Sequence, residues 1–442
     1  MIQMKQQRAN DAHAQTIEIG SEVGKLCWMD RSHSRRAIPP RTLAIVVGSV
    51  LAIGGASIVF MAPTIKGLFG APPHVAPSPA AYASYDLVSK SANDAFLLVR
   101  PPGGRLLSAS GLYRTTDAGT TWHRIPLPAL PDGVALVVSS LPGGKLFLRI
   151  FGLPNGAQQF YTGDGTTWTT IPVPDEGTGS LQMIDVRLGF YVVTQTAGTP
   201  SVQELAVYRT QDGGDSWEPR VELTADHPNA GGLHLSDDNR FVTFSDATHG
   251  WLVAVPPSWA IVCGATSPGD SVEHLMASND GGASWSATSL PALPQGSTEL
   301  SPPVFPNQGS AGFLTALAHT YIRECPPVGT TYVYGTRDGG ATWVGPRMVP
   351  GPYFDSPDGI LWWASDGHQM FRSTNEGQSW KATKSKLPSP AVTLIELFAV
   401  DAQTAWSLWS AGTDLPQAQP QPEVLLRTTD AGEHWSSVKL PS

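Results

Sequence analysis

Charged side chains are scarce in this chain of 442 residues, at 15% of the total, and cysteine is nearly absent, with three residues. Three cysteines cannot build the disulfide framework of a small secreted domain, so a hydrophobic core must hold the fold together. Glycine and proline are plentiful instead, with 45 and 39 residues. This composition suits short strands joined by tight turns and suits long helices poorly, so it predicts an all-β protein.

Positive charge is scarce beyond the first 41 residues. That segment carries seven Lys or Arg residues against four acidic ones, which leaves 21 basic and 33 acidic residues, a net charge of −12, in the rest of the chain. An acidic surface repels the phosphates of DNA and RNA. The sequence therefore predicts no nucleic-acid partner.

One long stretch lacks charge altogether, from Thr42 to Ile65. As a helix it is long enough to cross about 30 Å of hydrocarbon. The basic residues precede it, and Lys66 is the only basic residue in the 24 positions after it, so the N-terminus is predicted to be cytoplasmic and the rest outside. A cleaved signal peptide is the alternative. It would have an unusually long basic region and a poor cleavage site at Met61-Ala62-Pro63.

Four segments are predicted from these features. Residues 1–41 form a cytoplasmic basic segment, and residues 42–65 form a transmembrane signal-anchor helix. Residues 66–81 are rich in proline, which favours extended polyproline II and makes a semi-rigid linker. Residues 82–442 form the folded part. The expected location is therefore the cell membrane, with a single span and an extracytoplasmic domain.

An Asp–Gly–Trp phrase recurs along the folded part. Six full copies span Thr115–Trp122, Thr210–Trp217, Ser278–Trp285, Thr336–Trp343, Ser373–Trp380 and Thr428–Trp435, and a shorter copy spans Thr162–Trp168. Successive Trp positions are 46, 49, 68, 58, 37 and 55 residues apart, which is the period of a β-propeller blade. Seven copies predict a single seven-bladed β-propeller, in which all blades are needed to close the ring.

Each repeat reads as four antiparallel strands, with the phrase in the turn between the third and fourth. In the last repeat the strands are expected at 393–398, 404–409, 424–427 and 435–440. The first repeat is already complete from Tyr82 to Leu127. We therefore expect the ring to close by packing the first blade on the last, without exchange of a strand.

The phrase itself has residues suited to a turn. The Asp carboxylate can accept hydrogen bonds from backbone N–H groups, Gly allows positive φ, and Trp covers the turn with a large apolar face. The positions predicted to have this structural role are Asp117, Asp164, Asp212, Asp280, Asp338, Asn375 and Asp430. Asn375 favours a structural role, because an amide can cap a turn but cannot replace a general acid or a nucleophile.

The phrase Ser/Thr-x-Asp-x-Gly-x-Ser/Thr-Trp resembles the Asp-box, or bacterial neuraminidase repeat, across residues 82–442. Proteins with this repeat include sialidases, two-propeller xyloglucanases, sortilin-type receptors and the photosystem II assembly and stability factors. The seven copies are evenly distributed, and the sequence of residues 113–122 is typical of them. In both respects this chain looks most like the photosystem II assembly and stability factors. The resemblance implies a sialidase-like superfamily propeller without catalysis that acts as a binding or assembly scaffold, although fold does not fix function.

A surface glycoside hydrolase, sialidase-like or xyloglucanase-like, is the alternative. Sialidases use three arginines around the substrate carboxylate, a Tyr–Glu pair and an Asp acid. Here the candidate arginines precede their Asp residues by one common offset, which indicates a repeat position rather than a converging triad: Arg114, Arg209, Arg372 and Arg427. His123–Pro126 keeps an Arg-Ile-Pro phrase but follows the first repeat phrase. Xyloglucanases place their carboxylates between two propellers, whereas one propeller is predicted here, so an enzyme is the less favoured interpretation.

No metal and no cofactor are predicted, because the histidines lack zinc-ligand spacing and no phosphate-binding or nucleophile-elbow motif occurs. Cys263 and Cys325 occupy similar places in adjacent repeats. Outside the cell they could form a disulfide or remain two unpaired thiols.

The loops between second and third strands must lie on the face opposite the Asp–Gly–Trp turns. Their predicted lengths differ widely, from the long stretch 256–273 to the short turn 365–368. Uneven loops on a rigid scaffold favour a binding surface for a protein or a glycan, although tolerated insertions are an alternative. The residues predicted to contact the ligand are Trp259, Tyr321, Arg323 and Glu324.

Overall fold

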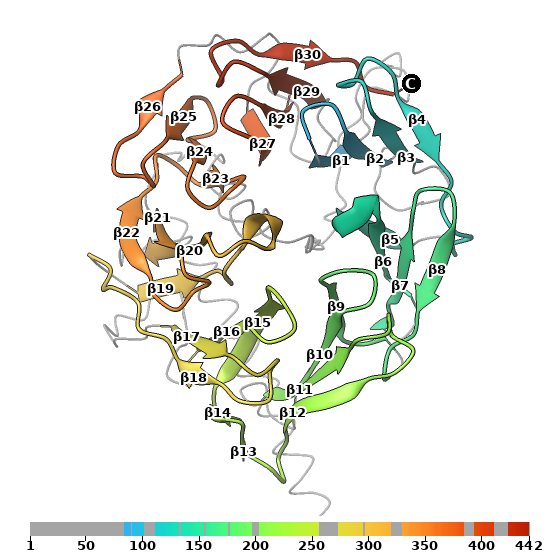
Figure 1. The fold of residues 1–442 in the computed structure, drawn as a ribbon, viewed down its shortest axis with the longest axis vertical. Helices are drawn as coiled ribbons and strands as arrows, with labels where there is room; N and C mark the ends of the chain where they lie inside the picture. Colours follow the sequence, from blue (N-terminus) through green and yellow to red (C-terminus); the bar gives the residue numbers. More distant parts are fainter. Residues whose placement is uncertain are drawn as a thin grey trace, which may run out of the picture. The chain divides into compact units, whose positions relative to one another are not determined.

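The computed structural model describes residues 84–441 apart from 90, 101–110, 132–133, 154–155, 176, 197–202, 256–272, 295–296, 320–328, 384–392 and 411–422. These residues all belong to one compact unit, Ala44–Ser442. They form seven antiparallel four-stranded sheets set around a common axis (Figure 1). The prediction of an all-β seven-bladed propeller is confirmed.

Each blade consists of four consecutive strands, and the first strand is nearest the axis (Figure 1). Blades 1 to 3 are β1 (Ser84–Ser89), β2 (Ala95–Arg100), β3 (Gly111–Thr115) and β4 (His123–Ile125); β5 (Ala135–Ser140), β6 (Leu146–Phe151), β7 (Gln159–Gly163) and β8 (Trp168–Ile171); and β9 (Ser180–Met183), β10 (Gly189–Thr196), β11 (Gln203–Thr210) and β12 (Glu218–Leu223).

Blades 4 to 7 are β15 (Asp238–Phe244), β16 (Gly250–Val255), β17 (His274–Ser278) and β18 (Ser286–Ala287); β19 (Ser297–Leu300), β20 (Gly312–His319), β21 (Gly329–Thr336) and β22 (Val344–Met348); β23 (Tyr353–Asp355), β24 (Trp362–Ser365), β25 (Met370–Ser373) and β26 (Lys381–Ala382); and β27 (Thr393–Ala399), β28 (Ala405–Ser410), β29 (Glu423–Thr428) and β30 (Ser436–Val438). A two-stranded ribbon, β13 (Asn229–Ala230) with β14 (Leu233–His234), and two 3-10 turns, η5 (Pro142–Gly144) and η7 (Pro306–Gln308), lie in connections.

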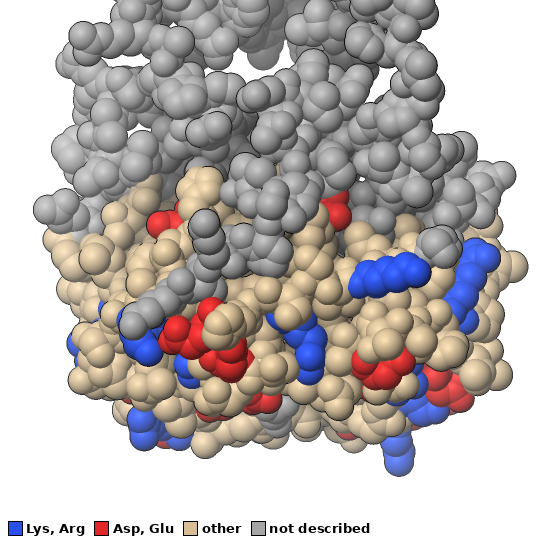
Figure 2. Space-filling model, turned by 90° about the horizontal axis from the view of Figure 1, so that it is seen from above, with Lys and Arg blue, Asp and Glu red and all other residues tan. Residues whose placement is uncertain are grey.

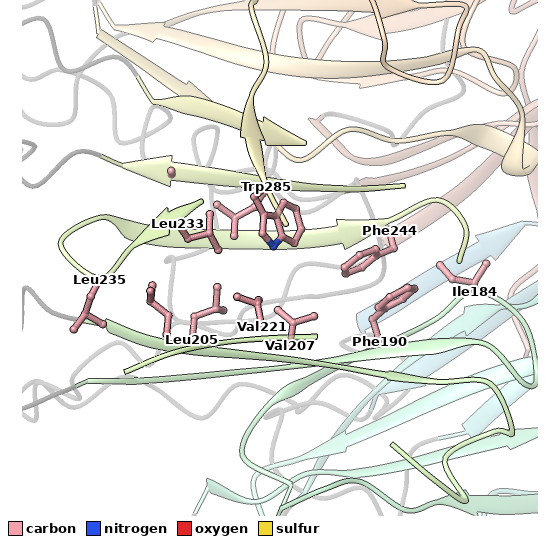
Figure 3. Packing of buried hydrophobic residues seen from close by; sticks show 12 residues of the cluster. Ile184, Phe190, Leu205, Val207, Val221, Leu233, Leu235, Phe244 and Trp285 are labelled. Carbon is pink, nitrogen blue, oxygen red and sulfur yellow. The ribbon is translucent and has the colours of Figure 1, made fainter. Parts of the chain in front are cut away.

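The second strand of each blade is buried on both faces, because neighbouring blades pack against both sides of it. In β28 the first five residues are buried, and Trp406 and Trp409 are fully buried. Between blades 3 and 4, the rings of Phe190 and Phe244 stack with centroids 3.5 Å apart inside a cluster that also contains Trp285 (Figure 3). This packing explains why the central strands read as continuous apolar runs rather than as alternating ones.

The ring closes without a shared strand, as the complete first repeat predicts. Blade 7 packs on blade 1 through a cluster that includes Leu87, Leu97 and Trp406. Hydrogen bonds also cross the same seam, among them one from the Leu87 N–H to Glu396 Oε2 at 3.2 Å and one from the Trp122 indole N–H to the Lys439 carbonyl at 2.8 Å. Apolar packing and a few side-chain hydrogen bonds therefore close the ring, a role that an exchanged strand has in other propellers.

The repeat Trp residues do more than cover their own turns. The indole N–H of Trp168 donates to the Pro126 carbonyl of the preceding blade at 2.7 Å. The bonds from Trp122, Trp217 and Trp380 likewise reach the preceding blade. In these four blades the third-to-fourth-strand turn therefore fastens its blade to its neighbour.

The Asp side chains at the turns bind their own loops. In blade 4, Asp280 Oδ1 accepts hydrogen bonds from the Ser278 hydroxyl and from the N–H groups of Ala283 and Ser284, and Oδ2 accepts the Ser284 hydroxyl. The hydroxyl of Ser278 in turn accepts the Gly282 N–H at 2.8 Å. The network satisfies backbone groups that a tight turn would otherwise leave unpaired.

Asn375 makes the equivalent contacts in blade 6. Its Oδ1 accepts from the Ser379 N–H and the Ser373 hydroxyl, and its Nδ2 donates to the Ser379 hydroxyl at 2.9 Å. The serine hydroxyl reverses its role, so the amide loses none of these three bonds.

Replacement of Asp280 should therefore depend on the shape of the new side chain. We expect Asp280→Ala to lower the free energy of unfolding by about 1 to 2 kcal/mol, because the hydrogen-bond donors of the turn lose their carboxylate acceptor. Asp280→Asn should change it by less than about 0.5 kcal/mol, since Asn375 shows how an amide fits. Urea unfolding of both variants at pH 7 measures the difference, and an equal loss in both would contradict this account of the turn.

Among the described residues no helix is long and apolar enough to cross a membrane. The predicted anchor, residues 42–65, and the linker, residues 66–81, lie outside the described residues.

Candidate functional site

The Asp–Gly–Trp turns and the turns between first and second strands lie at the same ends of the blades, which we call the turn face. The two kinds of turn are hydrogen-bonded to each other within a blade. In blade 7 the Ala431 N–H donates to the Gln403 carbonyl at 2.8 Å, and in blade 3 the Gly213 N–H donates to the Arg187 carbonyl at 2.8 Å. Backbone groups on this face are thus bonded within the fold rather than presented to a ligand.

A second recurring Asp holds the turns between first and second strands. In blade 7, Asp401 Oδ1 accepts the N–H groups two and three residues further on, each at 2.7 Å. The same pattern occurs at Asp185, Asp246 and Asp358. This second repeat was not predicted from the sequence. Its signal at Asp185, Asp246 and Asp401 was an Asp followed four residues later by Gly or Ala and then by an aromatic residue, as in Asp401 with Ala405 and Trp406.

The Asp carboxylates of the Asp–Gly–Trp turns are poor general acids. Hydrogen bonds from the Thr121 hydroxyl and N–H lower the pKa of Asp117 to about 2. Corresponding donors lower the pKa of Asp212 and Asp338 to about 2 as well. A general acid must hold a proton near the working pH, which these groups do not.

The candidate arginines do not converge. Arg114, Arg372 and Arg427 each lie over an aromatic ring of their own blade, with the guanidinium carbon 4.9 to 5.4 Å from the ring centroid. Arg209 pairs across the strands with Phe190 and binds Glu218 at 2.6 Å. Each arginine is therefore held within its own blade or its immediate neighbour.

The opposite ends of the blades carry the connections between second and third strands, and we call them the long-loop face. The residues predicted to contact a ligand there, Trp259, Tyr321, Arg323 and Glu324, lie outside the described residues. Cys263 and Cys325 do too, so the possible disulfide stays a prediction. What the structure does place on this face is a polar network between blades 2 and 3.

That network includes Tyr191, which is buried, and Arg149, which is half-buried. The Tyr191 hydroxyl donates to Asp175 Oδ1 at 2.6 Å and accepts the Gly179 N–H at 2.6 Å. Burial, followed by the bond to Asp175, raises the pKa of Tyr191. Arg149 donates from Nε to the neutral Oε1 of Gln158, and burial lowers the pKa of its guanidinium.

Arg149 has no ion pair with any described carboxylate. Partial burial of a cation without a charged partner destabilises a fold, and such groups are common at binding sites. The guanidinium fork fits a carboxylate or another planar anion. Arg149 is therefore the described residue on the long-loop face best suited to contact a ligand.

Arg149→Met should raise the free energy of unfolding by about 1 kcal/mol, because it keeps the apolar stem and removes a poorly compensated charge. Arg114→Met is the matched control, because Arg114 is paired with Asp94 at 2.8 Å, and its loss should be destabilising. Urea unfolding of both variants tests the contrast. If Arg149→Met destabilises the chain as much as Arg114→Met does, the charge of Arg149 serves the fold.

A cavity of about 390 Å³ lies on the turn face at the seam between blades 1 and 7. Its lining includes Thr120, Arg427, Asp430, His434 and Lys439. Two of its charged groups are already engaged, because Arg427 donates to the Ala92 carbonyl at 2.9 Å and His434 contacts Asp430 at 2.6 Å. Within the described part of the chain, no group of three His, Cys, Asp or Glu side chains could hold a metal ion.

Charges of both signs are interspersed on the flank of the ring (Figure 2). The flank in that view has no broad patch of one sign.

No protein-family model matches the sequence. Two curated relatives, both named xyloglucanase Xgh74A from Acetivibrio thermocellus, are 24% identical over 350 residues, which cover 72% of this chain and 34% of theirs. The chain thus spans about a third of the length of the curated relatives it matches.

Among solved structures, YCF48 bound to a D1 peptide is 17% identical with a TM-score of 0.43, covering 86% of this chain and 98% of that one. YCF48 from Cyanidioschyzon merolae is also 17% identical with a TM-score of 0.43, covering 80% and 97%. A polysaccharide lyase, the ulvan lyase of family PL25, is 12% identical with a TM-score of 0.48, covering 82% and 97%. At this level of likeness nothing about activity follows for the chain.

Proposed function

We propose that this protein is a non-catalytic Asp-box propeller that binds a protein or a glycan on its long-loop face and acts as an assembly scaffold. The observation that carries the proposal is the contrast between the two faces. Turns on the turn face bond to one another and hold their carboxylates ionised. The long-loop face has connections of very unequal length, and Arg149 there has no charged partner among the described residues.

The scaffold is proposed to stand outside the cell on a single N-terminal membrane span, residues 42–65. Two features of the sequence support this membrane span: residues 42–65 carry no charge, and basic residues precede them. Trp259, Tyr321, Arg323 and Glu324 are proposed to extend the binding surface around Arg149. Trp259 belongs to the longest of these connections in sequence, residues 256–273, and the other three belong to the corresponding connection of the next blade, residues 320–328.

A photo-crosslinking residue on each face tests the binding proposal in cells that express the full chain. Gln159 is exposed at the long-loop end of β7, and Thr120 is exposed on the turn face. We expect a discrete adduct from Gln159→p-benzoylphenylalanine and none from the same replacement at Thr120. Protease digestion of the adduct separates a protein partner from a glycan. Adducts from Thr120 alone, equal adducts from both positions, or none from either would contradict the proposal.

A xyloglucanase-like hydrolase is the second candidate, and the 24% identity to xyloglucanase Xgh74A favours it. Such an enzyme needs two carboxyl groups that flank the scissile bond, one of them protonated. Burial raises the pKa of one described carboxyl group, that of Asp355, to about 6. Its two oxygens accept the N–H groups of Ala399 and Ser356, at 2.6 and 2.8 Å, which favours a bond between blades over acid catalysis.

A further inference from the structure

Two strands at the axis carry a bulge with an exposed apolar side chain. In β15 the pairing with β16 shifts register between Arg240 and Thr243, and Phe241 in that bulge is 44% exposed. In β27 the pairing with β28 shifts between Leu394 and Glu396, and the skipped residue, Ile395, is 36% exposed. Bulges commonly redirect a side chain next to a functional site.

Neither side chain packs between blades. Leu394 and Leu397 join the cluster between blades 6 and 7, while Glu396 bonds to blade 1, so Ile395 is left out of both interfaces. Phe241 belongs to none of the buried clusters, although Val242 packs on the cluster between blades 3 and 4. On the innermost strand, a side chain that faces neither adjacent blade is directed to the axis. We call Phe241 and Ile395 the axial pair.

Phe241 is also held in an unfavourable backbone conformation, with φ of 53°. Positive φ is a genuine outlier for a bulky residue without a short polar side chain, and glycine would occupy it with less strain. An exposed phenylalanine in such a conformation gains nothing from burial that would offset the strain. Strain of this kind concentrates at sites of function.

The axial pair lies near the long-loop end of the axis. Phe241 is three residues from the start of β15, which pairs with the end of β16, and Ile395 is two residues from the start of β27. β1 also runs from that end, since Ser84 pairs with Arg100, the last residue of β2. β15 and β27 are on opposite sides of the axis, and β1 is next to β27 (Figure 1).

The chain therefore enters the ring at the place where two apolar side chains are exposed. Residues 67–83, which come directly before β1, contain no charged residue and include Val75, Tyr82 and four prolines. Ten residues of polyproline II reach about 30 Å, roughly twice the width of a four-stranded blade. A covalently attached segment also has an effective concentration in the millimolar range, which makes even weak apolar contacts sufficient.

We propose that the axial pair is a docking site for the chain's own segment 71–83. Its proline and tyrosine side chains contact Ile395 first and Phe241 beyond it. Docking would fix the direction in which the propeller stands relative to the segment that precedes it. This inference is separate from the proposed partner on the long-loop face.

Hydrogen exchange of the full chain in detergent tests the docking. We expect amides of residues 74–83 to exchange at least tenfold more slowly than in an unstructured peptide, and Phe241→Gly or Ile395→Ser to remove that protection. Met348→Ser is the matched control, because Met348 is 62% exposed on the outer strand β22 and should leave the protection intact. Phe241→Gly should also raise the unfolding midpoint, so lost protection cannot be ascribed to misfolding.

Three results would overturn the proposal. The first is rapid exchange of residues 74–83 in the unmodified chain, and the second is unchanged protection in Phe241→Gly and Ile395→Ser. The third is protection that grows with protein concentration, which would identify a second copy as the occupant.

Discussion

Trp406→Ala should lower the free energy of unfolding by about 3 to 5 kcal/mol and open the ring at one place, between blades 7 and 1. The side chain is fully buried and packs against Leu87, Ala95 and Leu97 of blade 1. Because no strand is exchanged across this seam, its apolar contacts carry most of the closure. Loss of the indole leaves a cavity at a seam where no backbone hydrogen bonds between strands hold the two blades together.

Trp363→Ala is a control matched in three respects. Trp363 occupies the same position of the second strand in blade 6, is also fully buried, and pairs with an arginine as Trp406 does. Its cluster, however, joins blades 6 and 7. Both variants should lose a similar amount of stability, but only Trp406→Ala should accelerate hydrogen exchange in β1 and β2. Equal acceleration of β1 and β2 in both variants would contradict closure by this seam.

The stability of the chain should fall by about 2 to 3 kcal/mol as pH rises from about 4 to 7 because of one residue, Asp355. Burial raises the pKa of its carboxyl group to about 6, against about 4 in an unfolded chain. Between these values the folded state holds a proton that the unfolded state releases. The stabilising contribution is therefore complete below pH 4 and is lost as pH rises through 6.

Asp355→Asn should remove this pH dependence. The amide can still accept the Ala399 N–H but gives up the bond from Ser356, so we expect the variant to be less stable than the parent at pH 4.5 and more stable at pH 7.5. Asp338→Asn is the control. The pKa of Asp338 is lowered to about 2, so its carboxylate keeps its charge across this pH range. Urea unfolding at the two pH values measures both. A slope that persists unchanged in Asp355→Asn would show that another group causes it.

The repeat predicted the fold because its phrase is tied to one place in every blade. Asp, Gly and Trp are needed together at the turn between third and fourth strands, so seven copies give seven blades. Strand positions in the last repeat are also close, with 404–409 predicted and Ala405–Ser410 observed. The apolar run of this second strand is a local signal, and the packing of blades on both of its faces accounts for it.

The two bulges and the environment of Arg149, which are the features most relevant to binding, could not be predicted from the sequence. A bulge at Phe241 or Ile395 depends on pairing with the next strand, and nothing in the local pattern marks the extra residue. That Arg149 has no charged partner among the described residues depends on which side chains neighbouring blades bring near it. The predicted contact residues, the disulfide and the membrane span stay predictions, because they lie outside the described residues.

Release of reducing ends from xyloglucan by the purified full chain, across pH 4 to 8, tests the central claim most directly. The account predicts no release above that of a buffer blank, because the turn carboxylates are held ionised and Asp355 is bonded between blades. Turnover that rises with protein concentration and is lost in a carboxylate variant would contradict it. That result would make the chain a hydrolase rather than a scaffold.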